Sequence, residues 1–154
     1  MSKPLHLFVK PHHLAGRLVW SLTANRPPEV ADEVWAEDHL MPGEVELWRQ
    51  MSNEDRRHSF KVARRFVEAH PPATRAEIAG ALLHDVGKIE CGLGTWGRVA
   101  ASVVGGRTEK FRTYHDHERI GAELAAAAGS EPVTVELINE EGPLYPILKA
   151  SDRT

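Results

Sequence analysis

Residues 74–88 read TRAEIAGALLHDVGK, and this stretch decides the fold class. Its apolar residues recur every three or four positions, at Ile78, Ala79, Leu82, Leu83 and Val86, which is the spacing of a helix with one buried face. Thr74 is suited to cap the first turn, and Gly87 to end the helix. The same periodicity returns along the chain, and strict alternation never persists beyond four residues. We therefore predict an all-α fold.

Working outward from this stretch, we expect helices on both sides of it, separated by breaks such as Met41-Pro42-Gly43. Ser52, followed by Asp55, should cap a long helix that ends before His70-Pro71-Pro72. The other expected helices cover residues 28–40, 44–51, 117–129, 130–138 and 144–152, with a short helix inside 1–25 and another in a glycine-rich loop at 91–106.

The composition describes an ordinary globular protein of 154 residues, with 42% hydrophobic and 27% charged residues. A formal net charge of -3 gives no broad basic surface, so a long nucleic acid is not an expected partner. No apolar run approaches the roughly 20 residues of a membrane span, and the first residues do not resemble a signal peptide. The single Cys91 excludes an internal disulfide and a thiolate zinc site. We expect a cytoplasmic protein without a membrane partner.

Polar residues that suit a metal lie on the apolar faces of the expected helices. His84 and Asp85 flank the stripe of the central helix, His58 lies beside Ser59 on the inner edge of another, and Asp152 falls on the apolar face of the last. An ionised carboxylate at the edge of a core costs several kcal/mol unless a cation or a donor compensates it. Imidazole and carboxylate ligands together suit Mn, Mg, Fe, Co, Ni or Zn.

The order His58, then His84-Asp85, then the distant Asp152 resembles the HD superfamily of metal-dependent phosphohydrolases. The match extends over residues 52 to 154 and includes Leu82-Leu83-His84-Asp85-Val86-Gly87-Lys88. A further likeness is the segment from His117 to Ala122, which is similar to the His-x-x-x-Gly-Ala helix of many members. Gly121 in this segment would let the helix lie close to its neighbours.

The resemblance implies one HD-like helical bundle over residues 1–154, with an N-terminal helical arm at 1–40 and a metal-binding core at 44–154. It implies one or two divalent ions. The metal ligands would be His58, His84, Asp85, His117 and Asp152, with Asp85 as the bridge if two ions bind. His115 would join them only if the helix begins between it and His117, because two residues are about 200° apart on a helix.

The implied function is hydrolysis of a phosphoester in a small phosphorylated molecule, most simply a nucleotide, by water whose pKa the metal lowers. Asp85 and Lys88 would be catalytic, Lys88 by neutralising charge that grows on the phosphoryl oxygens. The candidates for substrate binding are Arg98, Arg107, Arg112, Arg119 and His115. No Gly-Tyr-Pro follows the His117 region, which disfavours the related cyclic-dinucleotide phosphodiesterases.

Other interpretations stay open at this point. The chain could be a di-iron oxygenase of the same fold, or a binding module that holds metal and nucleotide without turnover. His84-Asp85 could be a structural pair, His117 a core histidine, Lys88 a solvated cation at a helix end, and Asp152 a solvated carboxylate. A homo-oligomer is neither favoured nor excluded.

Overall fold

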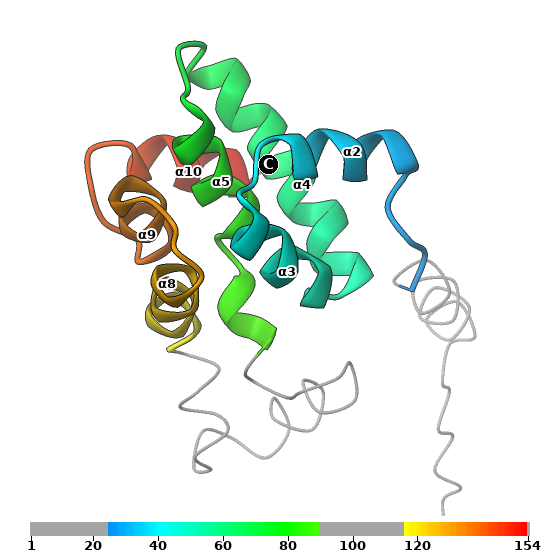
Figure 1. The fold of residues 1–154 in the computed structure, drawn as a ribbon. Coiled ribbons are helices and arrows are strands. Elements are labelled where there is room, and N and C mark those ends of the chain that lie inside the picture. The colour runs from blue at the N-terminus through cyan, green and yellow to red at the C-terminus, as the bar shows by residue number, and fades with distance from the viewer. Residues whose placement is uncertain (1–24, 90–115, 154) are drawn as a thin grey trace, which may run out of the picture.

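The computed structural model describes residues 25–89 and 116–153, and every regular element in these residues is helical (Figure 1). The predicted all-α class is confirmed. The elements are α2 (Val30–Asp38), α3 (Pro42–Gln50), α4 (Asn53–Ala69), α5 (Arg75–Leu83), the short 3-10 helix η1 (Val86–Ile89), α8 (His117–Ala127), α9 (Pro132–Ile138) and α10 (Tyr145–Asp152). The helices expected within 1–25 and 91–106 lie outside the described residues.

Two predicted caps are present. The Ser52 hydroxyl accepts a hydrogen bond from the Asp55 amide at 3.1 Å and starts α4. Thr74 starts α5 with a reciprocal capping box, since its hydroxyl accepts from the Glu77 amide while the Glu77 carboxylate accepts from the Thr74 amide. Each cap satisfies amides that would otherwise lack a partner in the first turn.

Two helix starts differ from the prediction. Pro42 is expected in the break before α3, but it is the first residue of that helix. Proline fits this position because the first turn needs no amide partner from it. Ser130 does not cap α9, whose N-cap is Glu131. The Ser130 hydroxyl instead donates to the buried Glu44 carboxylate at 2.7 Å. The Ser130 side chain thus makes a tertiary contact in place of the predicted helix cap.

Helix α5 lies at the centre of the molecule, packed against α4, α9 and α3. The one-sided stripe predicted for it is too narrow, because Gly80 and Ala81 on its other side are buried as well. A Cβ added at Gly80 would lie 2.9 Å from the Leu137 side chain, so α9 covers this face closely. A helix that is apolar on all sides is an internal helix.

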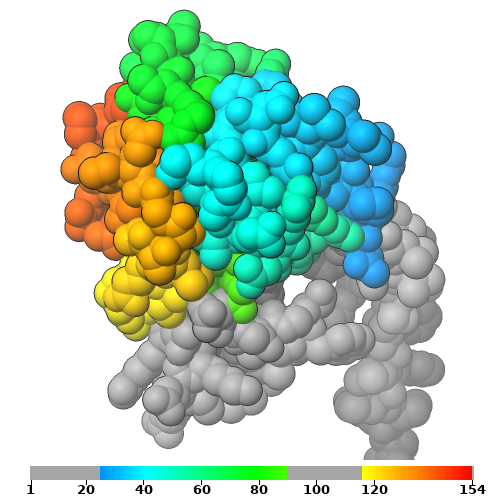
Figure 2. Space-filling model, in the orientation of Figure 1, coloured from blue at the N-terminus to red at the C-terminus, as the bar shows by residue number. Residues whose placement is uncertain are grey.

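The remaining helices form the outer layer around α5. Figure 2 shows side chains of α3 meeting those of α8 and α9 across one face of the molecule. At this junction a Cβ on Gly43 would stand 2.2 Å from the Ala128 carbonyl oxygen. Ala36 and Leu40, at and just after the end of α2, belong to the same buried cluster as the core of α5.

Gly87 has a different role from the one predicted. Helix α5 already ends at Leu83, and Gly87 lies inside η1, where a Cβ would come within 1.7 Å of the His117 carbonyl oxygen. Gly121 lies on the other side of this junction, and a Cβ added there would be 3.0 Å from the Gly87 nitrogen. The close packing expected of Gly121 is confirmed, and the two glycines bring the start of α8 against η1.

Within the described residues, no helix has the length and apolar character needed to cross a membrane.

Candidate metal centre

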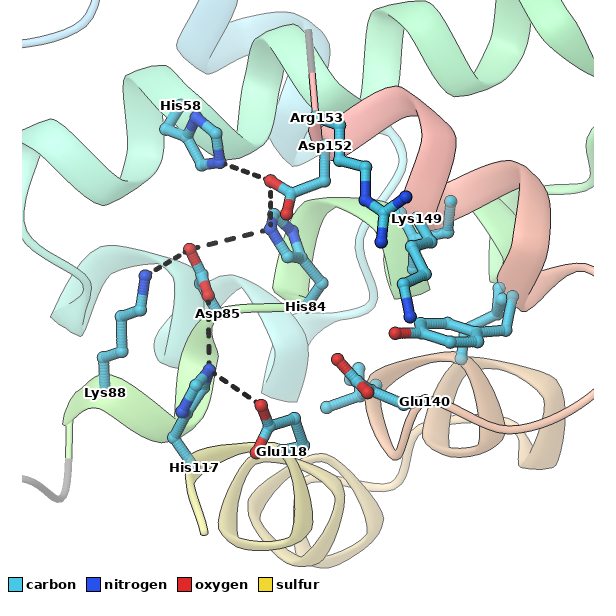
Figure 3. A pocket seen from close by; sticks show the side chains of 14 residues that line it. His58, His84, Asp85, Lys88, His117, Glu118, Glu140, Lys149, Asp152 and Arg153 are labelled. Atoms are coloured by element: carbon cyan, nitrogen blue, oxygen red, sulfur yellow. Dashed lines mark hydrogen bonds and ion pairs between the residues drawn. The ribbon is translucent and has the colours of Figure 1, made fainter. Parts of the chain in front are cut away.

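Three residues that are distant in the sequence converge at one point. His58 lies on α4, His84 is the C-cap of α5, and Asp152 is the last residue of α10, which packs against α4 (Figure 3). His58 Nε2 lies 2.7 Å from Asp152 Oδ1. One ligand atom of each residue lies within 4.8 Å of the other two. Helix packing therefore assembles a His-His-Asp cluster.

The imidazole of His84 is oriented by the backbone. Its Nδ1 lies 2.9 Å from the Ala81 carbonyl oxygen, which can only accept, so Nδ1 donates and Nε2 is left with a lone pair. Nε2 is buried and has no hydrogen-bond partner among the described residues. It stands 3.6 Å from Asp152 Oδ1 and 3.6 Å from Asp85 Oδ2. A buried nitrogen in this state is costly unless something fills the gap in front of it.

The sequence pattern places the His84-Asp85 pair in the last turns of the helix. In the structure the pair follows the last helical residue. Helix α5 ends at Leu83, and Asp85 lies in the turn before η1. Neighbouring residues within a regular helix point about 100° apart. The change of backbone course at this point lets the two side chains face the same space.

Asp85 lies between the His-His-Asp cluster and α8. Its Oδ2 accepts from Lys88 Nζ at 2.6 Å, and its Oδ1 is 3.8 Å from His117 Nε2. Lys88 Nζ is also 3.8 Å from Asp55 Oδ1. The five predicted metal ligands thus line one cavity, and those of the His-His-Asp cluster offer ligand atoms that all lie within 4.8 Å of one another.

The charges of the site favour ionised carboxylates and a cation between them. Interaction with His84 and then with His58 holds the pKa of Asp152 well below its usual range, against the effect of burial. Burial also opposes ionisation of Asp85, yet His84, Lys88 and His117 together lower its pKa. Burial would lower the pKa of His84, but the Asp152 and Asp85 carboxylates outweigh it and raise that pKa.

The predicted substrate-binding residues are not brought to this point by the described structure. Arg98, Arg107, Arg112 and His115 lie outside the described residues. Arg119 is described, on α8, and does not line the cavity. Its exposed guanidinium pairs with Glu123 at 2.5 Å, one turn along the same helix.

A cavity of about 390 Å³ opens beside the cluster. Its charged and polar lining includes five residues that sequence reasoning missed: Glu118, Glu140, Tyr145, Lys149 and Arg153. Two of them carried a usable signal, because Arg153 directly follows Asp152 and Lys149 precedes it by one helical turn. Glu140 had none, since it lies in the turn after α9 and reaches the cavity only through the tertiary fold.

Comparison with known proteins identifies no relative, because no family model, no curated protein and no solved structure matches this chain. What the chain does must therefore be inferred from the residues of this cluster and its cavity.

Proposed function

We propose that this protein is a metal-dependent phosphohydrolase of the HD type that acts on a small phosphorylated molecule such as a nucleotide. The observation that carries the proposal is the buried, unpartnered Nε2 of His84, which faces the Asp152 and Asp85 carboxylates at 3.6 Å. A divalent cation in this gap would satisfy all three groups.

The residues fit such an ion. His58, His84 and Asp152 would hold it, and two ligands with bonds of about 2.0–2.2 Å can stand at most about 4.4 Å apart around one ion. The ligand atoms lie within 4.8 Å of one another, so only a slight contraction is required. The hydrogen bond from His84 Nδ1 to the Ala81 carbonyl is the kind of contact that fixes the tautomer of a metal-binding histidine.

A bound divalent ion would lower the pKa of water and polarise a phosphoryl group. In the hydrolysis, the water oxygen bonds to phosphorus, the ester P–O bond breaks, and the leaving alcohol takes a proton, so no oxidant or reductant is consumed. Lys88 donates to Asp85 and lines the cavity, where it would offset charge on the phosphoryl oxygens. His117 and Asp85, 3.8 Å apart, are the residues that would hold a second ion.

The cavity and the overall charge limit the substrate to a small molecule. Sites for small ligands occupy about 300–1,000 Å³, and this cavity, at about 390 Å³, is at the lower end. The formal net charge of -3 gives no surface suited to a long polyanion.

The test begins with the metal content of the full chain as purified, followed by removal with EDTA and reloading with Mn, Mg, Fe, Co, Ni or Zn. Release of phosphate or alcohol is then measured on a panel of phosphomonoesters and phosphodiesters. His84→Ala and Asp152→Asn should lose metal and activity, whereas His39→Ala and Asp38→Asn, which change residues near the end of α2, should retain both. Failure of every metal to support hydrolysis overturns the proposal, and two bound irons with oxygen consumption would favour the oxygenase instead.

A further inference from the structure

Two cations of α10 line the cavity without a carboxylate partner. Lys149 and Arg153 form no ion pair with any carboxylate in residues 25–89 and 116–153. Other cations of this part of the chain do form such pairs: Arg26, Arg49, Arg56, Arg75, Lys88 and Arg119. Lys149 and Arg153 therefore offer positive charge to the cavity that no carboxylate of the described residues neutralises.

The position of the two cations relative to the metal cluster follows from the helix. Residues four apart lie on one helical face, so Lys149 and Arg153 are neighbours, with Asp152 directly before Arg153. Figure 3 shows both on the Asp152 side of the cavity, with Lys88 on the opposite side of the cluster. Two like charges at this spacing repel each other. An anion held between them would remove that repulsion.

The ammonium of Lys149 is positioned by an aromatic ring. Its Nζ lies 5.4 Å from the centroid of the Tyr145 ring, within the range of a cation–π interaction. Burial and the neighbouring Glu140 carboxylate raise the pKa of Tyr145 to about 12. Glu140 has a φ of 61°, a left-handed conformation that glycine usually adopts after a helix. This left-handed residue thus lines the same cavity as the ring and Lys149.

The two cavity carboxylates on the α8–α9 side lie nearer to other groups than to the cations of this site. Glu118 Oε1 lies 3.3 Å from His117 Nε2, and Glu140 is close enough to Tyr145 to raise the pKa of its hydroxyl. Neither is paired with a cation of α10. The charge left for a ligand at this end of the cavity is therefore positive.

We infer that Lys149 and Arg153 form a second anion-binding site that determines substrate specificity, and that the preferred substrate carries two separate phosphoryl groups. This inference rests on the proposed function. One phosphoryl group would react beside His58, His84 and Asp152, and the other would bind Lys149 and Arg153. A guanidinium binds phosphate through two parallel hydrogen bonds, and an ammonium adds a third donor. A purely structural role, in which the cations only favour the C-terminal end of α10, would affect stability but not substrate choice.

The test compares two substrates that differ by one phosphate, trimethylene glycol bisphosphate and propyl phosphate, with metal-loaded full-length protein. The wild type should prefer the bisphosphate. In Lys149→Gln and Arg153→Gln, the ratio of kcat/KM for bisphosphate over monophosphate should fall about tenfold, mainly through KM. Lys149→Arg should restore most of the ratio, and Lys61→Gln, a matched loss of charge on the exposed face of α4, should not change it.

A binding measurement separates failure of this inference from failure of the proposed function. Calorimetry on EDTA-treated protein compares trimethylenediphosphonate with propylphosphonate. Tighter binding of the diphosphonate that is lost in Lys149→Gln and Arg153→Gln supports the second site even if no ester is hydrolysed. If hydrolysis occurs but the ratio and the diphosphonate affinity are the same in all variants, the inference is wrong and the hydrolase proposal stands.

Discussion

At the scale of single residues, the candidate metal centre consists of two imidazoles and one carboxylate that meet at the ends of α5 and α10. Asp152 is about half exposed, at 45%, and its hydrogen bond to His58 joins residues 94 positions apart. An exposed pair of this kind contributes about 1 kcal/mol or less to stability. Its geometry, which prepares the cluster for a cation, matters more than its energy.

Because the His58–Asp152 pair matters more for its geometry than for its energy, Asp152→Asn should impair metal binding but change stability little. The metal-free variant should unfold within about 1 kcal/mol of the wild type, because the amide still hydrogen-bonds to His58. The gain in melting temperature on adding Mn or Zn should disappear, since a neutral amide is a poor ligand. Denaturant titration with EDTA and thermal melts with metal measure the two quantities. A variant that melts early in EDTA but keeps the full metal response would contradict this assignment.

The shifted pKa values predict opposite pH responses with and without metal. The raised pKa of His84 adds stability below about pH 6.5 that is lost as the pH rises through the folded-state pKa. The lowered pKa values of Asp85 and Asp152 add stability above about pH 4 that is lost on acidification. The metal-free protein should therefore be most stable between these limits.

Metal binding needs a neutral imidazole, so the protection that a metal gives should increase as the pH rises through the raised pKa of His84. Melting temperatures in EDTA and in Mn, recorded from about pH 5 to pH 8, test both statements. Protection that stays constant over this range would indicate that His84 is not a ligand.

At the scale of elements, the η1–α8 junction positions His117 opposite Asp85. In Gly87→Ala the new Cβ would lie 1.7 Å from the His117 carbonyl oxygen, so η1 and α8 must separate. We expect a loss of about 1–3 kcal/mol in the free energy of unfolding. Gly121→Ala, whose nearest neighbour would be at 3.0 Å, should cost less. Denaturant unfolding gives this order, and equal costs would mean that the junction adjusts freely.

Replacing the left-handed Glu140 in the turn after α9 by glycine should raise stability and lower selectivity. Glu140 occupies a left-handed position, and such strain costs about 1–3 kcal/mol. Glu140→Gly should therefore be more stable than the wild type by about 1 kcal/mol, yet prefer the bisphosphate less because the carboxylate next to Tyr145 is lost. Glu141→Gly, at an ordinary φ, should be no more stable than the wild type. A Glu140→Gly protein that is less stable than the wild type and equally selective would contradict this prediction.

At the scale of the whole molecule, the sequence predicted the class of fold and much of its layout. Helical periodicity and the caps at Ser52 and Thr74 depend on neighbours in the chain, and they were predictable. The burial of Gly80 and Ala81 was not, because small residues do not show which face another helix will cover. His58, His84 and Asp152 could be chosen because each interrupts an apolar face. Lys149 and Arg153 had their spacing from Asp152 as a signal, but the cavity that they line is a product of tertiary packing.

Metal binding should stabilise the molecule as a unit, because the three cluster residues join α4, α5 and α10. Metal at a hundred times its dissociation constant adds about 2.7 kcal/mol. Amide hydrogen exchange should slow in α10 together with the end of α5, and less in α2, which contributes no ligand. Slowing confined to α10 would show that the ion does not connect these helices.

Helix α10 is eight residues long and provides the Asp152 carboxylate and Lys149, while its C-cap, Arg153, is the second cation that lines the cavity. It packs mainly against α4. A change of substrate during evolution, or by design, could therefore be achieved by exchanging this one short segment while the other helices are kept.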